Sequence, residues 1–159
     1  MNRSPAEAFK HSPWRRRMVA LAVALVLAVA WGSLIQTQFN LNALVALGVE
    51  MPVRLRLQTS LQDLLGFGPV YAGIVLAAWL PSLAVASWLA RRKPAWRIGL
   101  FTLAAGVALP IAVRVTDAVA PMPVFIDATR GLGGLLAMTI GSAAGGALFA
   151  RWTWPRHRA

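Results

Sequence analysis

Four long apolar segments constrain the fold of this chain more than any other feature of its sequence. A helix needs about 20 apolar residues to cross the roughly 30 Å hydrocarbon core of a bilayer, because its backbone amides find no hydrogen-bond partner in lipid. Segments close to this length are residues 18–35, 68–90, 98–119 and 131–150. The third is interrupted by Arg114, whose guanidinium we expect to extend toward the interface while the helix continues to about Val119. The sequence predicts an all-α membrane protein, a four-transmembrane-helix bundle.

The composition supports a membrane location. Of 159 residues, 58% are hydrophobic and 13% are charged, whereas a soluble domain normally has about a quarter charged residues. The net charge of +11 would indicate nucleic acid in a soluble protein, but here Lys and Arg are confined to short segments between apolar runs. We therefore expect lipid phosphates, and no nucleic acid, as partners. The chain has no cysteine, which excludes disulfides and iron–sulfur ligation by its own thiolates.

The distribution of cationic residues predicts the orientation of the bundle. Twelve Lys and Arg residues lie in the tail 1–17, the segment 91–97 and the tail 151–159. The other four are Arg54, Arg56, Arg114 and Arg130. Because cationic segments stay in the cytoplasm, we expect both basic tails there, flanking a membrane domain over residues 18–150, in a bacterial inner membrane. Five of the seven tryptophans flank the cationic ends, as interfacial aromatics do.

The first apolar segment has a second interpretation as a secretory signal peptide. Arg15–Arg17 would form its charged region, and Ala28-Val29-Ala30 has the small-residue form of a cleavage site. The apolar run continues through Ile35, which is long for a signal peptide and favours a retained span.

Small residues recur every four positions in each span, a spacing that lets membrane helices pack closely. The fourth span carries Ala137, Gly141 and Gly145, which include a G-x-x-x-G motif. Similar stripes in the other spans are Ala20, Ala24, Ala28 and Gly32; Ala78, Ser82, Ala86 and Ala90; and Ala104, Ala108 and Ala112. These predict packing within one four-helix monomer, with homo-oligomerisation through the fourth helix as the alternative. Pro81 and Pro110 predict bends.

The first outer connection, residues 36–67, is long enough to hold structure of its own. We expect Asn40 to cap a short helix, and Pro52 to open a second helix that Gly66 ends. That second helix is amphipathic: Leu57, Leu61, Leu64 and Leu65 share one face, and Arg54, Gln58 and Gln62 share another. It would lie in the extracytoplasmic interface or form a lid on the bundle. A short strand over residues 53–57 is the competing interpretation. The candidates to bind lipid headgroups or a partner are Arg54, Arg56, Gln58 and Asp63.

The second outer connection holds two opposite-charge pairs at three-residue spacing, Arg114 with Asp117 and Asp127 with Arg130. Ionisable groups near membrane depth are candidates for function unless they pair with one another. Mutual pairing is available here, and Asp127 is placed to cap the fourth helix.

The sequence shows no pattern for catalysis, a metal or a cofactor. Its only histidines, His11 and His157, lie in the tails, and no glycine-rich phosphate loop appears. We expect a non-enzymatic accessory or assembly subunit of a membrane complex, with the bilayer, anionic headgroups and a membrane protein or second copy as partners. Alternatives are a small-solute transporter or channel, and a lipid-interface enzyme in which Arg54 and Arg56 hold phosphate and Asp63 or Asp127 acts as base.

Overall fold

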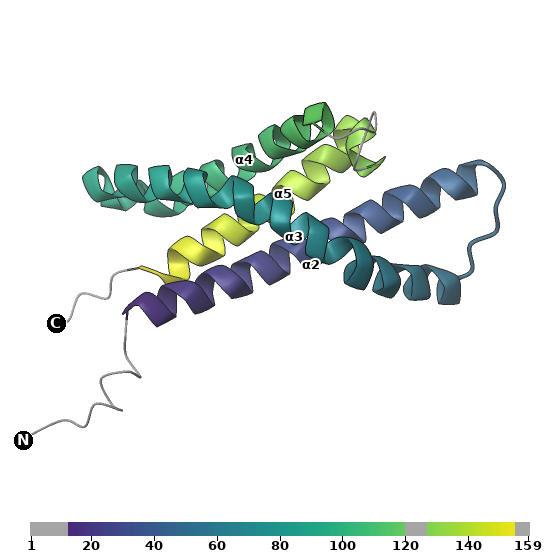
Figure 1. The fold of residues 1–159 in the computed structure, drawn as a ribbon, viewed down its shortest axis with the longest axis horizontal. Helices are drawn as coiled ribbons and strands as arrows, with labels where there is room; N and C mark the ends of the chain where they lie inside the picture. Colours follow the sequence, from purple (N-terminus) through teal and green to yellow (C-terminus); the bar gives the residue numbers. More distant parts are fainter. Residues whose placement is uncertain (1–12, 120–126, 155–159) are drawn as a thin grey trace, which may run out of the picture.

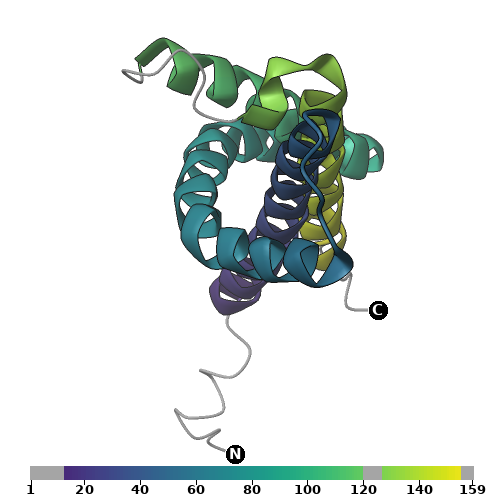
Figure 2. The same cartoon turned by 90° about the vertical axis from the view of Figure 1, so that its right-hand side faces the viewer.

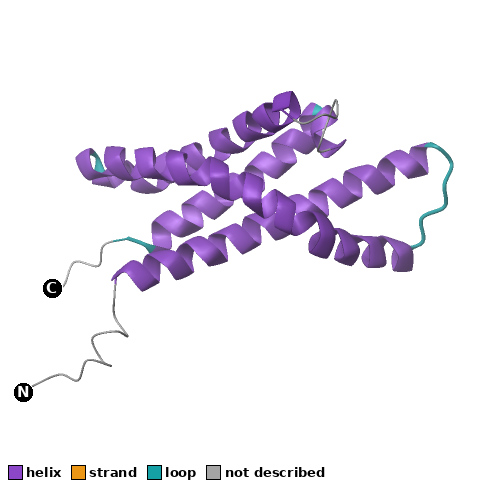
Figure 3. Cartoon of the chain, viewed as in Figure 1, coloured by secondary structure: helices purple, strands orange, loops and turns teal. Residues whose placement is uncertain are grey.

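The computed structural model describes residues 13–119 and 127–154, and these form helices joined by short turns (Figures 1 and 3). The four long helices are α2 (Pro13–Ala46), α3 (Val53–Arg92), α4 (Arg97–Val119) and α5 (Leu132–Trp152); two 3₁₀ turns are η1 (Pro94–Trp96) and η2 (Asp127–Arg130). Each long helix is long and apolar enough to cross a membrane. The prediction of an all-α chain with four helices of membrane-spanning length and apolarity is confirmed for the described residues. The tails 1–12 and 155–159, residues 120–126 and the side chains of Asp127 and Arg130 lie outside the described residues.

Successive helices run in opposite directions, and α5 packs against both α4 and α2, which closes the bundle (Figure 1). The start of α2 and the end of α5 meet at one end, where the Arg16 guanidinium donates a hydrogen bond to the carbonyl of Trp152. The longest helix, α3, contains Pro69 and Pro81 and follows a curved path around the bundle (Figure 2). Proline removes a backbone hydrogen bond and favours such bending.

Large aromatic side chains fill the centre of the bundle. Trp79, Tyr71 and Phe101 are almost completely buried. The indole nitrogen of Trp79 donates to the Ser142 hydroxyl at 2.9 Å, and that hydroxyl donates to the Ala105 carbonyl at 2.7 Å. This chain of hydrogen bonds joins α3, α5 and α4, and it satisfies the buried Trp79 indole and Ser142 hydroxyl.

Glycines on α5 allow the neighbouring helices to approach it. A Cβ on Gly145 would lie 2.5 Å from the Trp79 ring, and one on Gly141 would overlap the ring of Trp31. A Cβ on Gly146 would overlap the Phe101 carbonyl oxygen of α4. The third member of the α5 stripe, Ala137, accepts a hydrogen bond from the Trp31 indole at 2.8 Å. Ala137, Gly141, Gly145 and Gly146 of α5 are therefore occupied by contacts within the chain.

The first outer connection differs from its prediction. The segment 36–67 is not a loop with separate helices, because α2 continues to Ala46 and α3 begins at Val53, leaving only residues 47–52 between them. Asn40 is an interior residue of α2 rather than a cap, and α3 passes through Gly66 without ending. Pro52 does precede α3 as its N-cap, and Gly48 makes the turn with a φ of 86°. Several polar side chains of this segment form hydrogen bonds between the two helices, namely Thr37, Gln38, Asn42, Arg56, Ser60 and Asp63.

The start of α5 also differs from its prediction. Its N-cap is Gly131, with no side-chain cap, whereas Asp127 begins the 3₁₀ turn η2 that precedes the helix. Asp127 therefore does not occupy the N-cap position of α5, which is Gly131.

Candidate functional site

Polar side chains join α2 and α3 beyond the aromatic core. The Thr37 hydroxyl is fully buried and lies 2.8 Å from an Asp63 carboxylate oxygen and 2.9 Å from the Ser33 carbonyl, with one proton to share between them. This contact places Asp63 against α2 and occupies one of its carboxylate oxygens. The predicted candidate therefore has a structural partner.

Two turns earlier along α3, Arg56 also points toward α2. Its guanidinium donates to the side-chain oxygens of Gln38 at 3.3 Å and Asn42 at 3.2 Å. The Gln38 amide in turn donates to the Ser60 hydroxyl at 3.2 Å, and Ser60 donates to the Arg56 carbonyl. Arg56 is thus part of the α2–α3 contact, and it differs from Arg54, which is exposed.

The opposite face of this part of α3 is apolar and uncovered. Leu57 and Leu61 are each 63% exposed and Leu65 is 79% exposed, while Leu64 is half-buried. Arg54 and Gln58 are exposed as well. The amphipathic helix expected here is present as the first part of α3, but its leucine face does not pack on the bundle as a lid would.

The second group of candidates belongs to the end of α4 and to η2, and η2 contacts α2. The buried Gln36 side chain accepts a hydrogen bond from the Ala128 backbone at 2.8 Å, which fastens η2 to α2. Arg114 is exposed near the end of α4, and Asp117 is half-buried and engaged in an interaction. Asp127 and Arg130 mark the ends of η2.

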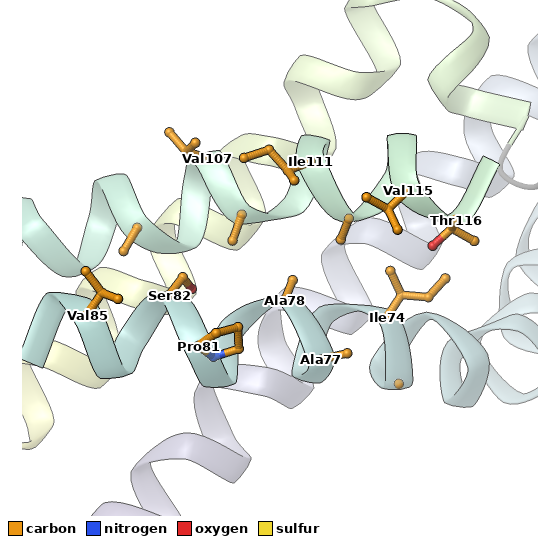
Figure 4. A pocket seen from close by; sticks show the side chains of 14 residues that line it. Ile74, Ala77, Ala78, Pro81, Ser82, Val85, Val107, Ile111, Val115 and Thr116 are labelled. Carbon is orange, nitrogen blue, oxygen red and sulfur yellow. The ribbon is translucent and has the colours of Figure 1, made fainter. Parts of the chain in front are cut away.

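An apolar groove of about 800 Å³ lies between α3 and α4 (Figure 4). Its floor consists of half-buried small residues, namely Ala78, Ser82, Ala104, Ala108 and Ala112. Its rim includes Val85, Val107, Ile111 and Val115, each more than half exposed. We refer to this feature as the α3–α4 groove.

We did not predict the α3–α4 groove from the sequence, because the small residues of its floor were interpreted as packing contacts between helices. Ala78 and Ser82 of the predicted α3 stripe face the α4 stripe, but methyl groups and one hydroxyl do not fill the space between them. The rest of the α3 stripe, Ala86 and Ala90, is buried in the core, as is the adjacent face that carries Tyr71, Val75 and Trp79. The sequence feature that indicates the groove is the pair of small-residue stripes in two consecutive spans.

In residues 13–119 and 127–154, no three His, Cys, Asp or Glu side chains lie close enough together to hold a metal ion. Comparisons with known proteins add no assignment: no protein-family model, curated protein or solved structure matches this chain.

Proposed function

We propose that this protein is a non-enzymatic accessory or assembly subunit that receives a transmembrane helix of a larger membrane complex in the α3–α4 groove. The observation that carries the proposal is the small-residue floor shared by two helices and left open along one side of the bundle. Helices associate in lipid through close backbone approach at small residues, not through hydrophobic burial. A floor of alanines on both sides suits a helix seated between α3 and α4.

The length of the groove also suits a helix. Its lining extends from Gly73 to Val85 on α3 and from Ala104 to Thr116 on α4, which is about 18 Å, or more than three helical turns. Pro81 lies in this lining and has no amide hydrogen for the Ala77 carbonyl, four residues earlier, which lines the groove too. A partner helix with a Ser or Thr at this level would supply a donor.

The alternative functions have less support from the packing. A small-solute transporter or channel needs a path through the bundle, and the interior here is filled by Trp79, Tyr71 and Met138. A lipid-interface enzyme would use Arg54 and Arg56 to hold phosphate and Asp63 or Asp127 as base, but Arg56 and Asp63 are engaged by α2 side chains.

The proposed setting is a bacterial inner membrane with both termini in the cytoplasm. About 20 residues of a helix cross the hydrocarbon core, so α2, with 34 residues, and α3, with 40, would extend well beyond it. If about 20 residues are counted from the cationic end of each helix, the remaining residues include those that form the polar α2–α3 contacts. The exposed leucines of α3 would then lie in the outer interface. Arg54 would then face lipid headgroups.

Reporter fusions test this orientation. A reporter inserted after Pro94 should signal cytoplasm, and one inserted after Gly48 should signal the opposite side, because twelve cations lie on the first side. Reversed signals would contradict the proposed orientation.

The groove itself is tested by filling it. Ala78→Leu with Ala108→Leu places two larger side chains on its floor, and Ala144→Leu adds the same side chain at an exposed position of α5. Each tagged variant is purified in mild detergent from its native membrane, and the stoichiometry of co-purifying proteins is measured beside the melting temperature. We expect the groove variant to lose a stoichiometric partner by about tenfold while the control retains it.

Two results would contradict the proposal. Equal retention of the partner by both variants would show that the groove does not hold it. Loss of self-association in place of a foreign subunit would assign the groove to a second copy of this chain and reject the accessory role.

A further inference from the structure

The end of the bundle opposite the α2–α3 turn contains a second, smaller pocket to which all four helices contribute. Its volume is about 410 Å³. Its lining includes Arg17 at the start of α2, Ser87 and Arg91 near the end of α3, Arg97 at the start of α4, and Phe149 near the end of α5. We refer to it as the arginine pocket.

Arg97 is held in place within this pocket. Its guanidinium donates to the Thr153 hydroxyl at 2.8 Å and lies over the Phe101 ring at 4.7 Å. Thr153 donates in turn to the Phe149 carbonyl at 2.7 Å. The Arg97 Nε is buried and has no hydrogen-bond partner. A fixed guanidinium loses little side-chain entropy when it binds a ligand.

The charge of the pocket is not neutralised by its own lining. Arg17, Arg91 and Arg97 all line it, and no carboxylate does so in the part of the chain that the structure describes. Neighbouring arginines have other contacts: Arg16 donates to the carbonyls of Trp152 and Trp154, and Arg92 stacks on Trp88. Three like charges around one concavity favour an anion that accepts several hydrogen bonds.

We propose that the arginine pocket binds the phosphate group of an anionic phospholipid. The planar guanidinium presents paired donors that match phosphate oxygens, and the Ser87 hydroxyl adds another group that can donate. The pocket opens at the ends of four membrane-length helices, and Ala90, Pro94 and Phe149 give it apolar walls. Basic pockets between transmembrane helices bind lipid headgroups in this way. Free phosphate presents the same chemistry, and the experiment below separates the two sources.

The test uses the full chain in detergent, with two double variants that remove equal charge. Arg17→Gln with Arg91→Gln removes two exposed arginines of the pocket, and Arg15→Gln with Arg92→Gln removes their sequence neighbours, which do not line it. Melting temperature is measured against added phosphatidylglycerol, phosphatidylcholine or inorganic phosphate at constant ionic strength. We expect phosphatidylglycerol to stabilise the unmodified protein, the pocket variant to bind it about tenfold more weakly, and the control to change by less than about threefold.

A third variant, Arg17→Lys with Arg91→Lys, keeps the charge and removes the paired donors, so it should bind with an affinity between those of the unmodified protein and the glutamine variant. It also serves if the glutamine variant does not fold.

The other outcomes contradict the proposal. Equal losses in the pocket variant and the control would assign the effect to the general charge of this end. Stabilisation by inorganic phosphate as strong as that by phosphatidylglycerol would assign the pocket to free phosphate and reject the lipid. No preference for phosphatidylglycerol over phosphatidylcholine would reject an anion site. Because the pocket is separate from the α3–α4 groove, none of these results depends on the proposed partner helix.

Discussion

Substituting Gly146 with alanine should separate α4 from α5 and destabilise the bundle. The new Cβ would overlap the Phe101 carbonyl oxygen and lie 2.6 Å from the Ala105 Cβ, whereas carbon atoms in contact normally lie about 3.5–4.0 Å apart. The helices would have to move apart by about 1 Å, since neither obstructing atom is the end of a flexible side chain. Overpacking of this kind costs about 1–3 kcal/mol, and the better helix propensity of alanine offsets up to about 1 kcal/mol. We expect a net loss of about 1–2 kcal/mol.

Gly99→Ala is the matched control for this measurement. Gly99 is a helical residue of α4, and a Cβ there would have no neighbouring atom within 4 Å. The control should be unchanged or up to about 1 kcal/mol more stable. Both free energies of unfolding can be measured by titrating the purified protein in mild detergent with a denaturing detergent. If Gly146→Ala were as stable as Gly99→Ala, the close approach of α4 and α5 would be wrong, and with it the closure of the bundle.

Two further predictions concern polar contacts inside the chain. Ser142→Ala leaves the buried Trp79 indole without its acceptor and should cost about 1–2 kcal/mol in the same unfolding titration; Thr102→Ala, which removes a hydroxyl bonded only within its own helix, should cost much less. Arg56→Gln should raise amide hydrogen exchange around the α2–α3 turn because its contacts to α2 are lost, whereas Arg54→Gln, at an exposed position, should not; equal exchange in the two variants would mean that Arg56 does not join the helices.

Hydropathy and spacing predicted the number of long helices and their type, because the length of an apolar run is a direct physical requirement of the bilayer. The third span was predicted to continue past Arg114 to about Val119, and α4 does end there. Asn40, in contrast, was predicted to start a new helix, but it lies inside α2. An asparagine side chain favours a cap when it has no other partner. Nothing local in the sequence shows that a second helix is available to bind its neighbours.

Among the candidate residues of the first outer connection, contact with a second helix likewise distinguishes residues that the sequence alone treats as alike. Arg54 and Arg56 are equivalent as charges in a sequence, but a difference of two positions turns them to different sides of α3. Arg56 faces Gln38 and Asn42, while Arg54 remains exposed. Helical periodicity predicts that the two differ, and only the position of α2 shows which of them is engaged.

The two ends of the bundle differ in the groups available to their arginines. Four of the five acidic residues belong to the end with the α2–α3 turn, where amide and carboxylate side chains of α2 and α3 pair across the helices. At the other end the antiparallel topology brings together Arg17, Arg91 and Arg97, which are far apart in the sequence, around one pocket. In the sequence, these residues contribute only to the number of cations beside the spans, and that number is used to predict the orientation of the helices in the membrane. Their convergence adds geometry to that charge, and three guanidinium groups around a concavity favour a specific anion over a diffuse layer of counterions.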